Sequence, residues 1–252
     1  MFKVTFQLQG DLGDLVPARQ RGRFRRQLPA PASAKDTVEA LGIPHTEVDL
    51  LLADGRPLDF SFLVDRELTI EVFPVPPVDP SSPRPESRLQ PRPLRHERFV
   101  CDAHLGKLAR LLRMLGFDTT YSRRAREADL ARSACTEDRA ILTCSRALLK
   151  HKRIRLGRLI RSRRVDVQAE EVIRRFRLAG RIDPFGRCAA CNGELESVAK
   201  KLVARRVPTQ TFAWRDTYSR CLACDHLYWD GTHVARLRRR FAAILAAARE
   251  VT

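Results

Sequence analysis

The sequence predicts an α/β protein in which a parallel-sheet domain follows a small β-rich domain and precedes a cysteine-containing segment. Three observations carry this prediction. Strand and helix patterns alternate over residues 98–180, strand patterns dominate residues 1–75, and two C-x-x-C pairs lie within residues 185–234. Regular alternation is typical of a parallel sheet with helices on both faces. Residues 235–252 predict a C-terminal helix, basic at first and then apolar.

Residues 1–75 favour a β-grasp, ubiquitin-like domain. The segment FKVTFQLQ alternates apolar and polar residues, as a half-buried strand does. The segment ASAKDTVEALGI predicts one short helix, which Ser33 or Asp36 could cap and Gly42 could end. EVDLLLADGRPL predicts a strand that enters an Asp-Gly turn, and RELTIEVFPV predicts the closing strand. One helix and paired strands at this length indicate the β-grasp fold.

Residues 76–97 predict a linker, because they are rich in proline, serine and arginine. Proline fixes φ and lacks a backbone donor, so this stretch is expected to form neither a helix nor a sheet ladder. We expect a semi-extended, solvated spacer. Contact between its arginines and a phosphate backbone is the alternative.

The domain at residues 98–180 is expected to carry a site at one end of its sheet. Its predicted strands are RFVCD, DTTYS, RAILTC and GRLIRS, and its predicted helices are GKLARLLRMLGF, EADLARSACTED, RALLKHK and DVQAEEVIRRFRLAG. Sites in such sheets form beyond the carboxyl ends of the strands, and Asp102 ends the first strand. Alternatively, Asp102 could accept hydrogen bonds from the helix N-terminus at Gly106–Lys107.

Two C-x-x-C pairs predict a structural zinc site at residues 185–234. Two residues between thiolates allow a tight turn to direct both sulfurs at one ion, and two such pairs complete a tetrahedral site. Four thiolates leave no open coordination position, so the ion would stabilise the fold. Iron at the same sulfurs and a redox role for either pair are the alternatives. The predicted ligands are Cys188, Cys191, Cys221 and Cys224.

Aromatic and basic residues surround these cysteines. Trp214, Tyr218, Tyr228 and Trp229 could form a stacking surface together with nearby arginines, or they could supply the small core that a zinc ribbon needs. The remaining cysteines, Cys101, Cys135 and Cys144, lack metal-like spacing, and we expect buried, inert thiols, with Cys144 as the one candidate exception because it lies near the expected site.

The charge predicts a polyanionic partner. The formal net charge is +17 and the pI is about 10.6, and nucleic acid is the usual partner of such a chain. Basic composition without a partner is the alternative. The segment HKRIRLGRLIRSRR contains seven cations and no acid, whereas a solvated helix face usually mixes both signs. The residues assigned to nucleic-acid binding are Lys107, Arg110, Arg146, Lys152, Arg153, Arg155, Arg161, Arg163 and Arg164.

The sequence argues against a membrane location. It contains no apolar run of about 18 residues, and its N-terminus lacks the pattern of a signal peptide. We expect a cytoplasmic protein with no membrane partner. In a reducing compartment, cysteines more often bind metal or stay free than form disulfides.

Several segments of the chain form a recognisable set of motifs: FVCDAHLGKLARLLRMLGFDTTY, ILTCSRALL, RCAACNGELESVAK and RCLACDHLYWDGTHVARL. Through these segments the chain resembles the Mut7-C family, and VEALGIPHTEVDLLLADGRPLDFSF extends the resemblance to the N-terminal domain. The resemblance implies a PIN-like ribonuclease domain joined to a C-terminal zinc ribbon, with an N-terminal ubiquitin-like domain.

A PIN-like fold implies clustered carboxylates that bind Mg²⁺ or Mn²⁺, which prefer oxygen ligands and activate water. The resemblance places catalytic residues at Asp102 and Asp129, with Glu127 as a substitute or helper. Ser145 occupies the third acidic position, where a hydroxyl contributes no charge. The fourth position falls in IRSRRVD, with Arg163, Arg164 and a late Asp166. The acidic set is depleted, and Asp166, Asp138 or Glu127 could partly restore it.

The resemblance and the charge together predict an RNA-binding protein with a PIN-like ribonuclease fold and, if the depleted site still functions, a metal-dependent endoribonuclease. A catalytically inactive RNA- or ribonucleoprotein-binding protein is the alternative, and a DNA-binding or regulatory protein is a third. Transfer RNA, messenger RNA and the ribosome are candidate partners. The N-terminal domain is expected to dock protein or RNA. Sulfur-carrier chemistry is excluded, because no Gly-Gly ends the closing strand.

Overall fold

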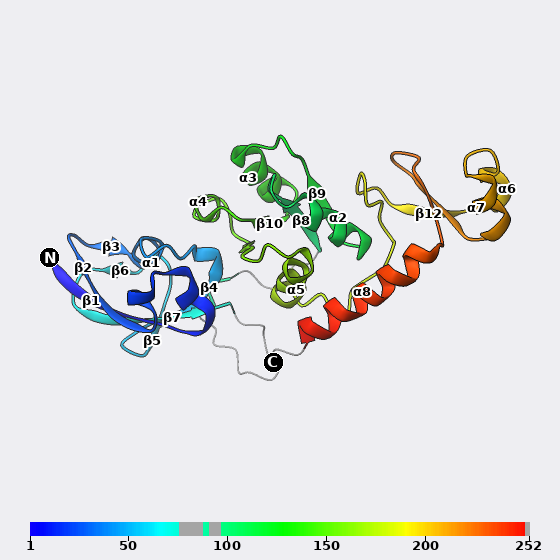
Figure 1. The fold of residues 1–252 in the computed structure, drawn as a ribbon. Coiled ribbons are helices and arrows are strands. Elements are labelled where there is room, and N and C mark those ends of the chain that lie inside the picture. Colours follow the sequence, from blue (N-terminus) through cyan, green and yellow to red (C-terminus); the bar gives the residue numbers. More distant parts are fainter. Residues whose placement is uncertain (76–87, 91–96, 250–252) are drawn as a thin grey trace. The chain divides into compact units, whose positions relative to one another are not determined.

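The computed structural model describes residues 1–75, 88–90 and 97–249 (Figure 1). The chain divides into two units, and each is assembled from two stretches of sequence. The first comprises Met1–His96 and Ala125–Ile160, and the second comprises Glu97–Arg124 and Arg161–Thr252. The segment 98–180, predicted as one domain, therefore contributes to both units.

The N-terminal residues form a five-stranded sheet in the order β2-β1-β7-β4-β5 (Figure 1). Strands β1 and β7 pair in parallel, and the other neighbours are antiparallel. A shorter antiparallel pair joins β3 to β6. The strands are β1 (Phe2–Leu8), β2 (Arg23–Leu28), β3 (Ala32–Ser33), β4 (Val48–Ala53), β5 (Arg56–Leu58), β6 (Leu63–Val64) and β7 (Leu68–Pro74). This sheet confirms the predicted β-rich domain.

The predicted short helix is α1 (Ala34–Glu39), which packs against the β3–β6 pair and η3. The Ser33 hydroxyl accepts a hydrogen bond from the amide of Asp36 at 3.0 Å, which is an N-cap contact. Gly42 lies just beyond the helix with φ +96°, a left-handed conformation that favours glycine. Short 3-10 helices complete the domain: η1 (Gly10–Leu15), η2 (Ala18–Gln20) and η3 (His45–Glu47).

Residues 125–160 add alternating helices and strands to the first unit. Strands β10 and β11 pair in parallel, with Ile141 opposite Gly157. Ile141 and Leu142 are fully buried, which explains the continuous apolar run in this strand. The elements are α3 (Glu127–Thr136), β10 (Ala140–Thr143), α4 (Arg146–Leu149) and β11 (Gly157–Leu159).

A buried polar network joins η3 to β11 within the first unit. The Glu47 side chain is 1% exposed and accepts hydrogen bonds from the Leu159 amide at 2.7 Å and Arg158 Nη1 at 2.5 Å. Arg158 also lies 3.6 Å from Asp11. Nε2 of His45 contacts the carbonyl oxygen of Ile154 at 2.8 Å. A charge this deeply buried needs its partner, so the network fixes the β-grasp domain against residues 125–160.

The predicted linker is only partly described, since residues 76–87 and 91–96 lie outside the described residues. Gln90 is 9% exposed, and its side-chain amide donates to the carbonyl oxygens of His45 and Val48, both at 2.7 Å. The Leu89 amide donates to the carbonyl of Asp49 at 2.8 Å. The prediction of a solvated spacer is therefore wrong for residues 88–90. Proline content alone does not reveal a glutamine that satisfies buried carbonyls.

The second unit begins with a parallel strand pair, β8 (Arg98–Cys101) and β9 (Asp118–Tyr121), connected by α2 (Gly106–Met114). Leu108 and Leu112 of α2 are fully buried, as their spacing predicts. Helix α5 (Val165–Phe176) packs against α2 and against α8 (Thr232–Arg249). Together with the first unit, these elements confirm the predicted α/β fold with parallel strands.

The cysteine-containing part forms an antiparallel sheet in the order β12-β13-β14. Its elements are β12 (Leu195–Val198), α6 (Lys200–Val203), α7 (Thr209–Trp214), β13 (Tyr218–Cys221) and β14 (Leu227–Trp229). Across the described ranges, no helix combines the length and apolar character needed to cross a membrane.

The Glu47 network predicts a measurable stability difference. We expect Glu47→Ala to lower the free energy of unfolding by about 3 kcal/mol, because it leaves the buried Arg158 without its closest carboxylate. Urea unfolding followed by circular dichroism measures this. Asp65→Ala is the matched control, since Asp65 pairs with Arg66 on the surface and should change stability by less than about 1 kcal/mol. Equal effects of the two substitutions would contradict the role of the network.

Candidate metal centre and acidic residues

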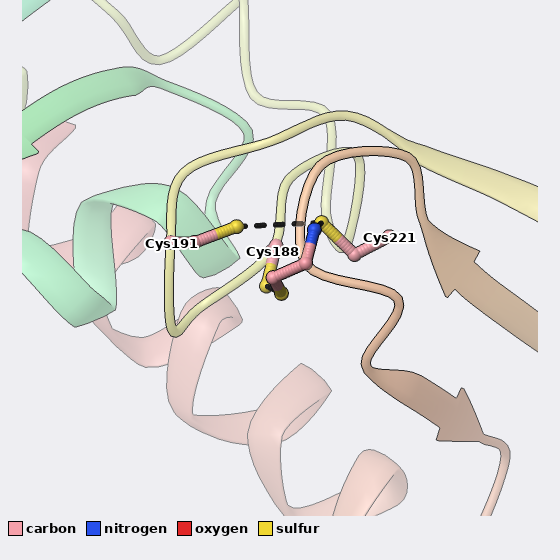
Figure 2. A group of neighbouring side chains, drawn as sticks. Cys188, Cys191 and Cys221 are labelled. Carbon is pink, nitrogen blue, oxygen red and sulfur yellow. Dashed lines mark hydrogen bonds between the residues drawn. The ribbon is translucent and has the colours of Figure 1, made fainter.

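Four cysteine sulfurs converge at one point of the second unit. The sulfurs of Cys188, Cys191, Cys221 and Cys224 all lie within 4.8 Å of one another. Those of Cys191 and Cys221 are 3.4 Å apart, and those of Cys188 and Cys224 are 3.7 Å apart. Figure 2 shows the sulfurs of Cys191 and Cys221 turned toward each other from separate loops.

Both C-x-x-C segments form the same turn. The Asn192 amide donates to the carbonyl of Cys188 at 2.9 Å, and the Asp225 amide donates to the carbonyl of Cys221 at 3.0 Å. Asn192 and Asp225 each follow the second cysteine of a pair and have φ of +77° and +60°. Asparagine and aspartate tolerate this left-handed conformation better than most residues. The local sequence thus directs two sulfurs inward from each turn.

Glycine is required beside the sulfurs. A Cβ atom at Gly193 would lie 2.8 Å from the sulfur of Cys221 and 3.4 Å from that of Cys191. The amide of Cys188 also donates to the carbonyl of Gly193 at 2.7 Å. A side chain at this position would therefore compete with the sulfurs for space.

The donor set fits a tetrahedral metal ion. Sulfurs that each lie about 2.3 Å from one ion are roughly 3.8 Å apart in a tetrahedron, close to the spacings here. Burial opposes ionisation of Cys188, but hydrogen bonds from Tyr228 and from backbone amides outweigh it and lower the pKa of that thiol to about 6. At Cys191 and Cys224, backbone amides lower the pKa, but burial and neighbouring sulfurs outweigh them and the net shift raises it, so Cys188 ionises most readily of these three thiols. A thiolate is the form that binds metal. The four cysteines therefore form a candidate metal site.

The aromatic residues near the cysteines divide between core and surface. Tyr218 is 1% exposed and packs with Val203 and Val207 in a small core. The hydroxyl of Tyr228 lies 3.1 Å from the sulfur of Cys188. Trp214 is 80% exposed. Tyr218 therefore takes the core role, and Trp214 is available to a ligand.

Two residues that the sequence analysis missed attach the first cysteine turn to α2 and β9. Arg113 is buried, and its guanidinium donates to the carbonyls of Thr119 and Ala190, both at 2.8 Å. Asn192 donates to Asp118 at 2.6 Å and accepts from the Thr119 amide at 2.9 Å. Burial lowers the pKa of Arg113, while nearby cysteines oppose that shift. An arginine within LLRML carries no sequence signal that distinguishes it from an exposed cation.

The predicted catalytic residue Asp102 directly follows β8 in the second unit. It is 6% exposed, and its Oδ1 accepts a hydrogen bond from the His104 amide at 2.8 Å. The His104 ring nitrogen lies 3.6 Å from the same oxygen. Asp102 thus lies at the carboxyl end of a parallel strand, where the sequence analysis placed it, in a buried and locally hydrogen-bonded state.

The other two predicted catalytic residues belong to α3 in the first unit and are exposed. Oε1 of Glu127 accepts a hydrogen bond from the Ser145 hydroxyl at 3.1 Å, so the structure brings these two predicted positions together. Asp129 accepts from the Arg126 amide at 3.1 Å and lies 3.6 Å from Arg132. Asp129 thereby caps the start of its own helix.

Asp166, which the sequence analysis offered as a replacement for a missing acid, forms an ion pair with an arginine of α8. Nε and Nη2 of Arg240 in α8 donate to one of its oxygens at 2.8 and 2.5 Å. In neither unit, as far as the residues are described, do three acidic or histidine side chains gather as the sulfurs do. Within either unit taken by itself, the described acidic residues therefore do not make up a divalent metal site.

Most cations assigned to nucleic-acid binding are exposed, but one is half-buried and another makes a hydrogen bond inside the protein. Arg161 is half-buried, and Arg146 donates to the carbonyl of Leu15 at 2.7 Å. The exposed members are Lys107, Arg110, Lys152, Arg153, Arg155, Arg163 and Arg164. Their side chains are accessible to a polyanion.

The expected burial is found for one of the three remaining cysteines. Cys101 is buried in β8, whereas Cys135 and Cys144 are exposed. The Cys135 thiol donates to the carbonyl of Arg153 at 3.2 Å. The expectation of burial was wrong for these two: Cys135 lies in the exposed last turn of α3, and Cys144 directly follows β10, where the chain leaves the sheet.

Comparison with protein-family models gives two matches that together span almost the whole chain. Residues 97–241 match the model described as Mut7-C RNAse domain, and residues 1–77 match the model described as Mut7-C ubiquitin. Searches of curated proteins and of solved structures returned no match.

The sulfur geometry predicts a tightly bound metal ion. We expect the purified chain to carry about one ion per molecule, and Cys188→Ser to lose it and to unfold the cysteine-containing sheet, because small sheets of this kind gain folding energy from the ion. Metal analysis by mass spectrometry and thermal unfolding measure both effects. Cys144→Ser, which removes an exposed cysteine outside the cluster, is the control. Unchanged metal content in Cys188→Ser would contradict the site.

Proposed function

This chain belongs to the Mut7-C family, and from that premise we propose that it is an RNA-binding protein built on a ribonuclease-like domain. The observation that carries the proposal is the set of exposed cations in the segment 152–164, which follows β10 of that domain: Lys152, Arg153, Arg155, Arg163 and Arg164. The ribonuclease description of the matching family model favours RNA over other polyanions.

The excess of cations over carboxylates supports this function. The chain has 47 lysines and arginines but only 30 aspartates and glutamates, so many cations have no carboxylate to neutralise them. The most buried cations are engaged inside the protein, as Arg158 is with Glu47 and Arg113 is with backbone carbonyls. The exposed remainder would bind phosphates, with counterion release as the driving force. Such binding carries little sequence preference.

Metal-dependent RNA cleavage is the second candidate function. The buried Asp102 at the end of β8 favours it, because a buried carboxylate at this edge of a parallel sheet is typical of a site. The depleted acidic set opposes it: Ser145 stands at one acidic position, and Arg240 holds Asp166. We therefore place RNA binding first and cleavage second.

We further propose that the ion of the cysteine cluster is Zn²⁺ in a structural role. Four sulfurs leave no coordination position for water or substrate, and structural zinc sites are closed in this way. For the N-terminal domain we propose a docking role toward protein or RNA. Its contacts with residues 125–160 occupy η3, so a partner would use its other faces.

One experiment separates binding from cleavage. Labelled single-stranded and hairpin RNAs are incubated with the purified chain and Mn²⁺, beside Asp102→Asn as a matched, nearly isosteric control. We expect both proteins to bind RNA with similar affinity. Cleavage by the wild type that is lost in Asp102→Asn establishes the second candidate, and uncleaved RNA with both proteins excludes it. Failure of the wild type to bind either RNA contradicts the proposed function.

Neutralising exposed cations should weaken RNA binding. We expect the double variant Arg163→Gln/Arg164→Gln to lower affinity by about tenfold and to reduce the slope of log K against log salt by about one to two, because up to two phosphate contacts are lost. Fluorescence anisotropy across a salt series measures this. Arg66→Gln in the β-grasp domain, where Arg66 is exposed, is the control. An unchanged slope in the double variant would show that this segment does not contact RNA.

A further inference from the structure

A groove of about 420 Å³ lies between α2, the start of α5 and α8, all within the second unit. It is distinct from the cysteine cluster and from the segment 152–164 discussed above. Its polar rim and apolar floor come from different residues. The lining residues are Lys107, Arg110, Leu111, Met114, Val165, His233, Arg236, Leu237 and Arg240.

Positive charge converges on this groove from two distant parts of the sequence. Lys107 and Arg110 lie one turn apart on α2, and Arg236 and Arg240 lie one turn apart on α8. None of the described lining residues is acidic. Cations held close together repel one another, so a fold that assembles them from separate helices is stabilised when an anion enters.

Few carboxylates of the protein neutralise the cations of this groove. Asp166 pairs with Arg240, and of the lining cations in the described chain, only Arg240 has a carboxylate within ion-pair distance. Lys107, Arg110 and Arg236 are exposed. Arg240 is thus held in place by Asp166, while the other three cations remain available to an external ligand.

The floor of the groove suits a nucleic acid better than a simple anion. Met114, Val165 and Leu237 are half-buried and present apolar surface among the cations, and Leu111 is buried behind them. A free phosphate would gain nothing from that surface, whereas a ribose or base would bury apolar area on it. A methionine sulfur also makes favourable contacts with aromatic rings. The volume lies within the usual range for ligand sites.

We propose that this groove is a second RNA-binding site, in which Lys107, Arg110 and Arg236 contact phosphates and the apolar floor receives the sugar or base of an unpaired nucleotide. The proposal rests on the RNA-binding function proposed above and deepens it. It gives α8 a direct role in the ligand-binding surface, in addition to its packing on α5. It also predicts a preference for single-stranded RNA, since a paired base is not free to lie on the floor.

The test compares two arginines of the same helix. Arg236→Gln removes a lining cation, and Arg239→Gln removes an exposed cation of α8 that does not line the groove. Fluorescence anisotropy of the full chain with a labelled single-stranded 20-nucleotide RNA, repeated over a salt series, measures affinity and salt slope. We expect Lys107→Gln/Arg236→Gln to lose about tenfold or more in affinity and about two in slope. For Lys107→Gln/Arg239→Gln we expect the slope of log affinity against log salt to fall by about half as much as for Lys107→Gln/Arg236→Gln.

The outcomes distinguish this inference from the proposed function. Equal losses in the two double variants overturn the groove but leave RNA binding in place, because the wild type still binds. No RNA binding by the wild type at low salt overturns the proposed function and the groove together. A duplex RNA of the same length that binds as tightly as the single strand overturns the role of the apolar floor. Circular dichroism of each variant verifies folding, which exposed side chains should not disturb.

Discussion

The imbalance between positive and negative charge is the constraint on which the structure depends. The chain has 47 lysines and arginines and 30 aspartates and glutamates. The buried cations form ion pairs or hydrogen bonds within the protein. Arg158 pairs with Glu47, and Arg113 donates to carbonyls near the first cysteine turn. The remaining cations lie on the surface, where they repel one another. A polyanion relieves this repulsion, and the function that we propose follows from it.

The shortage of carboxylates also weakens the case for metal-dependent catalysis. A nuclease site that binds two divalent ions needs several carboxylates close together. Here Asp129 caps its helix, Glu127 accepts a hydrogen bond from Ser145, and Asp166 neutralises an arginine. Each of these contacts stabilises the protein locally and competes with a metal ion for the same oxygens. Asp102 is the acid whose position most resembles a retained site, because it is buried at the end of a parallel strand.

Much of the fold could be predicted because its signals are local. The helix α2, the Ser33 cap and the two cysteine turns follow from spacing and residue type alone. Contacts between distant segments could not be predicted in this way. Nothing in the sequence around Arg113 or Gln90 indicates burial, since each depends on carbonyls elsewhere in the chain. The groove was missed for the same reason, because α2 and α8 contribute half of its charge each.

The most direct test of this account is the salt dependence of RNA binding by the intact chain. A plot of log affinity against log salt for a single-stranded RNA counts the phosphates that the protein neutralises. The account predicts tight binding at low salt and a slope of about −3 or steeper, as expected when several separate cations contact phosphates. A slope near zero, or no binding at about 50 mM salt, would contradict it.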